Sequence, residues 1–317
     1  MLPISVLMAV HNGSGHVHAA IDSILRQTFN DFEFIIVDDG STDDTKEIIK
    51  RYQDVDHRIR LISVAHAGQT RALNVGLIQC QGRYIARQDA DDVSLPRRLS
   101  VQHQWIDSCE ENVLVGCRAR YFDNSKEVLR LFREPPTNQK VVRRHLTYKN
   151  VFLHTSLMFR RIVSSRPVFY DDRIRYSQDF DLVTRISREG QIRLLREKYV
   201  TVQLTGARVS RNWLDQQKDH ARVIALTRRY PELDYLRDIS ITSISQYLTN
   251  LTSDQRYSAM IQFLSFIYGR CGFYEMIKSY DKNLCRLIYK NMDIVVVRLL
   301  GNLVKESVSK LPVKHSV

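Results

Sequence analysis

Three aspartates lie within four residues in the stretch Asp89-Ala90-Asp91-Asp92. They come just after the apolar run Tyr84-Ile85-Ala86, which predicts a buried strand. Carboxylates this close together repel one another unless they share a cation. Oxygen-only ligands suit a hard divalent ion, Mg²⁺ or Mn²⁺, and such an ion also binds the phosphates of a substrate. Taken alone, the stretch fits a solvated Asp-rich turn at least as well, so the elements around it decide between the two interpretations.

The first hundred residues alternate strand and helix patterns. Strands are expected at residues 4–10, 32–37, 59–64 and 84–87, because each is a short apolar run bounded by turn residues. Helical spacing of apolar residues fills the gaps, and Ser41 or Thr42 is expected to cap the second helix. This order predicts an α/β fold with a Rossmann-like, mainly parallel sheet flanked by helices. Ligands of such sheets bind at the carboxyl ends of the strands.

Polar side chains follow each of these four strands. Asp39 is placed to accept hydrogen bonds from a base ring, Arg71 to meet a base carbonyl or a phosphate, and a metal on the aspartates to bridge a diphosphate. The sequence therefore predicts a nucleotide pocket at this edge of the sheet. The residues that follow the strands are His11 and Asn12, then Asp38 and Asp39, then His66, Gly68, Gln69, Thr70 and Arg71, then Asp89, Asp91 and Asp92.

The rest of the chain is less regular. A helix is expected from Pro96, and short strands are expected at 151–153 and 157–159. From about Trp213 the pattern becomes helical. The expected organisation is a nucleotide-binding half at 1–105, an acceptor-binding half at 106–212 and a helical C-terminal region at 213–317.

Composition and charge narrow the class of protein. The net charge of +12 divides into −2 for residues 1–100, +8 for 101–210 and +6 for 211–317, so the basic part is not the part that carries the three aspartates. Five scattered cysteines without C-x-x-C spacing argue against a disulfide framework or a zinc site, and they favour a reducing compartment. Neither a signal peptide nor a membrane-spanning stretch is recognisable, which predicts a cytoplasmic protein.

Several ordered motifs within residues 3–105 resemble the inverting family 2 glycosyltransferases, of the bacterial surface-polysaccharide type, which have the GT-A fold. The matching segments are PISVLMAVHN (3–12), SILRQT (23–28), FEFIIVDDGSTDDT (32–45), ALNVG (72–76) and GRYIARQDADD (82–92), followed by Pro96, Arg98 and Leu99. The first motif often has Tyr before its Asn, and this chain has His11 there.

The resemblance implies roles for individual residues. Ala9 and Val10 would frame the nucleotide base and Asp39 would bind it, with Asn12 beside them. Asp38 would either join the base site or support its turn. Arg71 would contact base or phosphate. Asp89 would lie near the ribose, Asp91 near the metal and diphosphate, and Asp92 is a second candidate metal ligand.

An inverting transfer also needs a general base that takes the proton of the acceptor hydroxyl as it attacks. The segment Tyr176–Leu182 resembles the family's "ED" segment, with Gln178 in place of Glu and Asp179 at the base position. Asp171 and Asp172 are loop alternatives for the base, and Asp181 is interpreted as a helix-terminus charge. The resemblance also places His154 beside the acceptor, although a lone His between apolar runs is often purely structural. Residues 209–212 resemble a diphosphate lid.

Other classes fit less well. Residues 11–15 are too short and lack the basic residue of a nucleotidyltransferase loop, and they do not complete G-x-G-x-x-G or a P-loop. A nucleic-acid-binding protein would leave the pocket residues unexplained, and an inactive sugar-nucleotide-binding relative would not need Asp179. We therefore expect transfer of a hexose or N-acetylhexosamine from a UDP-sugar to a surface glycan or lipid-linked glycan, with Mg²⁺ or Mn²⁺ and without nucleic acid. The basic C-terminal region, including residues 292–303, fits a helix that lies on the inner face of the cytoplasmic membrane, and it fits an ordinary core-packing helix with solvated lysines equally well.

Overall fold

The computed structural model describes residues 2–123, 126–127, 135–146, 150–174 and 176–203. The chain divides into two compact units, residues 1–223 and 224–317, and all of the described residues belong to the first. The helical region expected from residue 213, the surface helix expected at 292–303 and the lid expected at 209–212 lie outside the described residues.

Four parallel strands form one side of the sheet, in the order β3-β2-β1-β4. They are β1 (Ile4–Val10), β2 (Phe32–Asp39), β3 (Ile59–Val64) and β4 (Tyr84–Arg87). All residues of β1 and β4 are buried, as expected of strands covered on both faces. The strands and the mainly parallel sheet that the sequence predicts are confirmed here.

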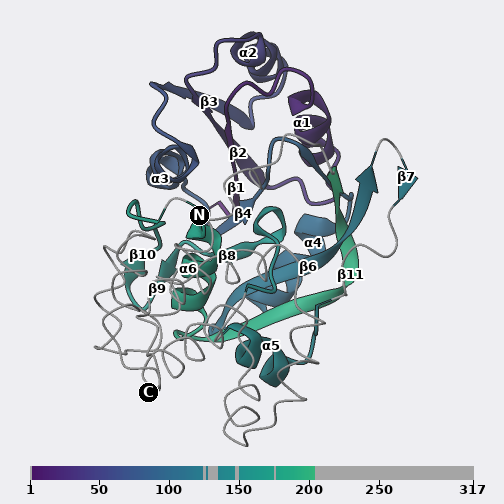
Figure 1. The fold of residues 1–317 in the computed structure, drawn as a ribbon, viewed down its shortest axis with the longest axis vertical. Helices are drawn as coiled ribbons and strands as arrows, with labels where there is room; N and C mark the ends of the chain where they lie inside the picture. The colour runs from purple at the N-terminus through teal and green to yellow at the C-terminus, as the bar shows by residue number, and fades with distance from the viewer. Residues whose placement is uncertain (1, 124–125, 128–134, 147–149, 175, 204–317) are drawn as a thin grey trace, which may run out of the picture. The chain divides into compact units, whose positions relative to one another are not determined.

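Helices cover both faces of these strands, and Figure 1 shows α1 and α3 on opposite sides of β1 and β2. On one face, alternate residues of β1 pack into a core with α1 and α2. On the other face, Gly76 of α3 lies so close to the sheet that an added Cβ would come within 2.3 Å of Leu7 Cδ1. The helices are α1 (Val17–Leu25), α2 (Thr45–Val55), α3 (Gln69–Gln79) and α4 (Arg98–Asp107).

Beyond β4 the sheet becomes mixed. Strand β8 (Met158–Arg160) pairs antiparallel with both β4 and β6 (Asn112–Asp123), and β11 (Gln191–Gln203) runs parallel to β6. Strand β5 (Asp92–Ser94) pairs antiparallel with the far edge of β11. The smaller elements are β7 (Lys126–Glu127), the β9–β10 hairpin (Ile162–Val163 and Arg166–Pro167), α5 (Gln139–Leu146), the 3-10 turn η1 (His154–Ser156) and α6 (Gln178–Ile186). The predicted nucleotide and acceptor halves thus share one sheet.

Two local predictions are wrong. Residues 151–153 are not a strand, because the Phe152 N–H donates to the Asn150 side chain at 3.0 Å and the chain then turns into η1. Neither Ser41 nor Thr42 caps the second helix, which begins at Thr45 after Asp44. Their polar groups bind the β1–α1 loop instead: Ser41 Oγ accepts from the Asn12 N–H, and the Thr42 N–H donates to Asn12 Oδ1.

Candidate active site

The polar residues expected at the strand ends lie together at the carboxyl ends of β1, β2 and β3. Asp39 is 2% exposed, and its carboxylate accepts from the Ala67 and Gly68 N–H groups at 2.8 and 3.0 Å. His66 Nδ1 lies 2.9 Å from the same carboxylate. Gly68 has φ +94°, a left-handed conformation that glycine adopts without strain. Asp39 therefore fixes the loop that leads into α3.

Asp38 and Asn12 hold the two neighbouring loops. Asp38 Oδ1 accepts from the Ser41 N–H at 3.1 Å, which favours the turn-supporting role of the two considered for it. Asn12, at φ +51°, accepts from the Thr42 N–H at 2.8 Å and donates its own N–H to Ser41. Asn is one of the few non-glycine residues that tolerates this conformation. These hydrogen bonds join the loops that follow β1 and β2 to each other.

His11 takes the place of the Tyr that is usual in the resembled family. Its ring stacks on the ring of His66 with a centroid distance of 4.1 Å, and its Nδ1 lies 2.8 Å from the Asp39 carbonyl oxygen. Ala9 and Val10 are buried, at 8% and 4% exposure, at the end of β1. Arg71 is exposed in the first turn of α3.

The three aspartates differ in their surroundings. Asp89 is half-buried; its carboxylate accepts from the Arg87 guanidinium at 2.6 Å, and its N–H donates to Thr155 Oγ1 at 3.2 Å. Asp91 is half-buried, whereas Asp92 is 2% exposed and opens β5. A buried residue of a strand is less accessible to a substrate-bound ion than its neighbour, so of the two expected ligands Asp91 fits a metal better.

The donor set can be tested against the chemistry of the expected ion. Among the described residues, no group of three or more His, Cys, Asp or Glu side chains is arranged to hold a metal. Mg²⁺ is commonly bound through one or two carboxylates, with substrate phosphates and water completing the shell. Asp91 supplies oxygen of that kind beside Asp89, so the residues fit a metal that binds together with a diphosphate rather than a resident ion.

Two fully buried arginines lie beneath the aspartates, and sequence reasoning gave them no role. Arg87 and Arg98 are both 0% exposed. Arg98 donates to Gln88 Oε1 at 2.9 Å and to Ser94 Oγ at 2.6 Å. Burial lowers the pKa of Arg98 to about 10, so it is still a cation at neutral pH. The charges of Arg87 and Arg98 offset the repulsion among the aspartates. In the sequence, the only sign of this was a basic residue at position 87, directly ahead of the acidic run.

Asp179 lies in the first turn of α6 and accepts from Asn150 Nδ2 at 2.9 Å. Burial raises the pKa of its carboxyl to about 6, and the charge of Asp89 adds to the rise, while the hydrogen bonds of Phe180 N–H and Asn150 oppose it. A carboxylate with a pKa near 6 is suited to proton transfer at neutral pH.

The other carboxylates of this region have structural partners. Asp181 forms an ion pair with Arg185 at 2.7 Å, in keeping with its structural interpretation. Asp171 pairs with Arg173 at 2.6 Å, and hydrogen bonding to that arginine lowers the pKa of the Asp171 carboxyl, which makes it a weaker base. Asp172 accepts from Asn74 at 2.7 Å. Asp179 is therefore the carboxylate of this region whose environment best suits a general base.

His154 lies in η1, next to the Thr155 that binds Asp89. Its Nε2 is 2.8 Å from the Tyr170 hydroxyl. Burial first, and then the charge of Arg87, lower the pKa of His154 to about 3, so the imidazole is neutral at physiological pH. Sequence reasoning missed Tyr170, because its partner is sixteen residues away and no motif joins the two.

Comparison with known proteins identifies the class. The family model "Glycosyl transferase family 2" matches residues 5–167, and the chain belongs to this family. It is 36% identical over 189 residues to the O-antigen biosynthesis glycosyltransferase WbnJ of Escherichia coli, in a match that covers 59% of this chain and 72% of that protein. The protein is therefore a glycosyltransferase.

Solved structures confirm the GT-A fold. Staphylococcus aureus TarS 1–349 in complex with UDP-GlcNAc superposes with a TM-score of 0.60 at 17% identity, over 84% of this chain and 81% of that chain. The mannosyltransferase PcManGT from Pyrobaculum calidifontis, in complex with GDP-Man and Mn²⁺, gives 0.58 at 18% identity, over 98% of this chain and 88% of that one. At these identities the likeness concerns the fold alone.

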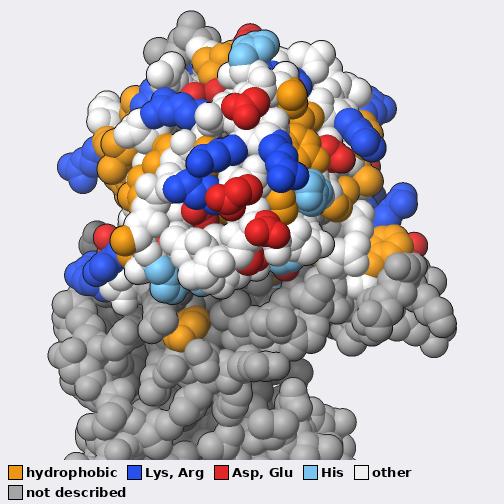
Figure 2. Space-filling model, turned by 90° about the horizontal axis from the view of Figure 1, so that it is seen from above, with side chains coloured by type: hydrophobic (Ala, Val, Ile, Leu, Met, Phe, Trp, Pro, Cys, Tyr) orange, Lys and Arg blue, Asp and Glu red, His pale blue; other side chains and the backbone are white. Residues whose placement is uncertain are grey.

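Charged side chains of both signs lie on the surface of the described residues. Figure 2 shows basic and acidic side chains interspersed on one face of the molecule, and exposed Lys50 and Arg51 of α2 share that helix with exposed Glu47 and Asp54. None of the helices among the described residues is long and apolar enough to cross a membrane.

Proposed function

We propose that this protein is an inverting glycosyltransferase that uses a divalent metal on the donor aspartates and Asp179 as general base. The observation that carries the proposal is the separation of two kinds of carboxylate. Asp89 and Asp91 form a cluster after β4 whose negative charge is offset by the buried arginines beside it. Asp179 lies on α6, and the pKa of its carboxyl is raised to about 6. One site is suited to a diphosphate and its metal, and the other to a proton.

The chemistry follows from these two environments. The bound metal would neutralise the charge that develops on the leaving diphosphate. Asp179 would accept the proton of the acceptor hydroxyl as its oxygen attacks the anomeric carbon. Asn150 orients the Asp179 carboxylate, and the α6 N-terminus favours its ionised form. Attack from the side opposite the leaving group inverts the anomeric centre.

The donor and acceptor are proposed from the relatives. TarS structures hold UDP or UDP-GlcNAc and PcManGT holds GDP-Man, which supports a nucleotide-sugar donor, and we favour a UDP-linked hexose or N-acetylhexosamine. The relation to WbnJ supports a surface glycan, free or lipid-linked, as acceptor. Peripheral attachment to the inner face of the cytoplasmic membrane is part of the proposal, and it rests on the basic charge of residues 101–317.

A donor screen tests this function directly. The full-length protein is heated with UDP, GDP and a panel of UDP- and GDP-sugars, each with Mn²⁺, with Mg²⁺ or with EDTA. A ligand at a hundred times its Kd stabilises the folded state by about 2.7 kcal/mol. We expect a rise in Tm for the UDP series with metal and little rise with EDTA. Equal stabilisation with EDTA would exclude the metal role of the aspartates, and no response to any nucleotide would exclude the function.

A further inference from the structure

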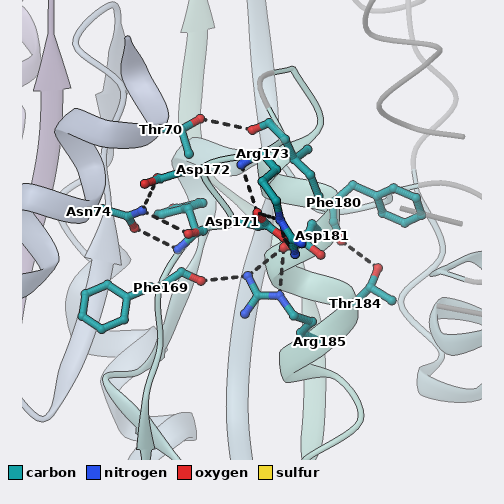
Figure 3. Close-up of polar contacts among 12 residues, drawn as sticks. Thr70, Asn74, Phe169, Asp171, Asp172, Arg173, Phe180, Asp181, Thr184 and Arg185 are labelled. Carbon is teal, nitrogen blue, oxygen red and sulfur yellow. Dashed lines mark hydrogen bonds and ion pairs between the residues drawn. The ribbon is translucent and has the colours of Figure 1, made fainter. Parts of the chain in front are cut away.

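Residues Phe169 to Ile174, here called segment 169–174, join the β9–β10 hairpin to α6 and lie between α3 and α6 (Figure 3). Asn74 of α3 pairs with the main chain of Tyr170 in both directions: the Tyr170 N–H donates to Asn74 Oδ1 at 2.9 Å, and Asn74 Nδ2 donates to the Tyr170 carbonyl at 3.0 Å. Asn74 Nδ2 also donates to Asp172 Oδ1 at 2.7 Å. One side-chain amide thus pairs with a main-chain amide as a neighbouring strand would.

The same segment is fastened to α6. Arg185 donates to the Phe169 carbonyl at 2.7 Å while its Nε donates to Asp181 at 2.8 Å. At the other end of the segment, the Thr70 hydroxyl donates to the Ile174 carbonyl at 3.4 Å. Segment 169–174 is therefore tied both to the helix that follows the base pocket and to the helix that carries Asp179.

The side chain of Tyr170 enters the transfer site from this segment. It is 4% exposed, its hydroxyl lies 2.8 Å from His154 Nε2, and the two rings meet edge to face at 5.6 Å. Burial raises the pKa of Tyr170, the charges of Asp179 and Asp89 raise it further, and the charge of Arg87 opposes the rise. The hydroxyl is therefore protonated at neutral pH, in electrostatic contact with both the donor aspartate and the candidate base.

We propose that Tyr170 is a positioning residue that fixes the orientation and the tautomer of His154 beside the acceptor, and that Asn74 sets the place of Tyr170. A phenol hydroxyl is a better donor than acceptor, so the contact at 2.8 Å favours a neutral imidazole that accepts at Nε2 and carries its proton on Nδ1. The other nitrogen then presents one defined group to an acceptor hydroxyl. This role rests on the proposed glycosyl transfer, and it gives a physical reason for the Asn within the 72–76 motif.

The experiment uses Tyr170→Phe, which keeps the ring and removes the hydroxyl, and Asn74→Asp, which keeps the shape and removes the donor. Arg173→Gln is the matched control, because Arg173 is an exposed residue of the same segment whose ion pair with Asp171 lies at the surface. Steady-state transfer and the imidazole NMR of isotopically labelled histidine are measured for each. The NMR readout reports the His154 tautomer without any substrate.

A misplaced reactive group can cost roughly a hundredfold in rate, and we expect Tyr170→Phe to lower kcat by about ten- to a hundredfold. The KM for the nucleotide-sugar should change little, and His154 should lose its single tautomer. Asn74→Asp should act in the same direction, and the double variant should be no slower than Tyr170→Phe alone, because both act through one hydrogen bond. Arg173→Gln should match the wild type.

An unchanged His154 tautomer together with an unchanged kcat in Tyr170→Phe would overturn the positioning role. A loss of donor affinity in place of the loss of kcat would also overturn it, because a merely structural defect would spread to the base pocket. If the wild type transferred no sugar, the proposed function would fail, and the NMR tautomer would still decide whether Tyr170 orients His154.

Discussion

The proposed donor side and the proposed acceptor side of this sheet hold their polar residues in different ways. On the donor side, Asp38 binds an N–H only three residues away, and the other contacts join neighbouring strand-end loops. On the acceptor side, Asp179 is held by Asn150, and Tyr170 is held by Asn74 across 96 residues of sequence. The proposed donor residues follow the ends of predictable strands, whereas the proposed acceptor residues lie on segments that only the tertiary fold brings together.

The largest expected effect concerns the acceptor side. Asp179→Asn keeps the shape of the side chain and removes its ability to accept a proton. We expect kcat for transfer to fall by about 10²- to 10⁴-fold, the range typical of a general base, with donor affinity retained. Steady-state kinetics and UDP binding with Mn²⁺ check this. Asp54→Asn, at an exposed carboxylate of α2, is the control. Near-normal transfer by Asp179→Asn would show that Asp179 is not the general base.

The success and failure of sequence reasoning follow the same division. Strands 4–10 and 84–87 were predictable, because a strand buried on both faces shows as a continuous apolar run. Asp89 and Asp179 were proposed from motifs, and their roles stay predictions. Arg87, Asn150 and Tyr170 were missed, because each acts through a side-chain hydrogen bond whose partner and effect only the folded chain defines. A hydrogen bond between residues far apart in the sequence leaves no periodic pattern from which it could be predicted.

The rate of transfer should depend on pH through the same carboxyl. With the pKa of Asp179 raised to about 6, the base is ionised above that pH, and the transfer rate should fall about tenfold per unit as the pH drops below it. Initial rates at a series of pH values on both sides of this pKa measure the effect, and Asp179→Asn should lose this limb of the profile. A limb that persists in the variant would assign the titration to another group.

The contribution of Asp179 to the free energy of unfolding should change with pH in the opposite direction to the transfer rate. A folded-state pKa above the ordinary value of 3.8 means that Asp179 favours folding below about pH 4, and that this contribution is lost as the pH rises through about 6. Relative to the wild type, Asp179→Asn should therefore gain stability between about pH 4 and pH 7. Denaturant unfolding at both values measures this, and a constant difference would place the pKa of Asp179 near its ordinary value.

A smaller effect is expected from the packing of the donor side. A Cβ on Gly82 would lie 2.3 Å from the main-chain nitrogen of Ser5, so Gly82→Ala should cost about 1–3 kcal/mol of stability, as overpacking does. Gly15→Ala is the control, because a Cβ there meets nothing within 4 Å. Urea unfolding compares them. Equal midpoints would contradict the close approach of the 80–82 turn to β1.

The separation of donor binding from proton transfer is most directly tested by calorimetric titration of UDP with Mn²⁺ into three proteins: the wild type, Asp91→Asn and Asp179→Asn. We expect Asp91→Asn to lose most of its metal-dependent affinity for UDP, whereas Asp179→Asn should bind UDP like the wild type and yet fail to transfer sugar. Equal loss of UDP binding in both variants, or full binding by Asp91→Asn, would contradict the division of labour between the two carboxylate sites.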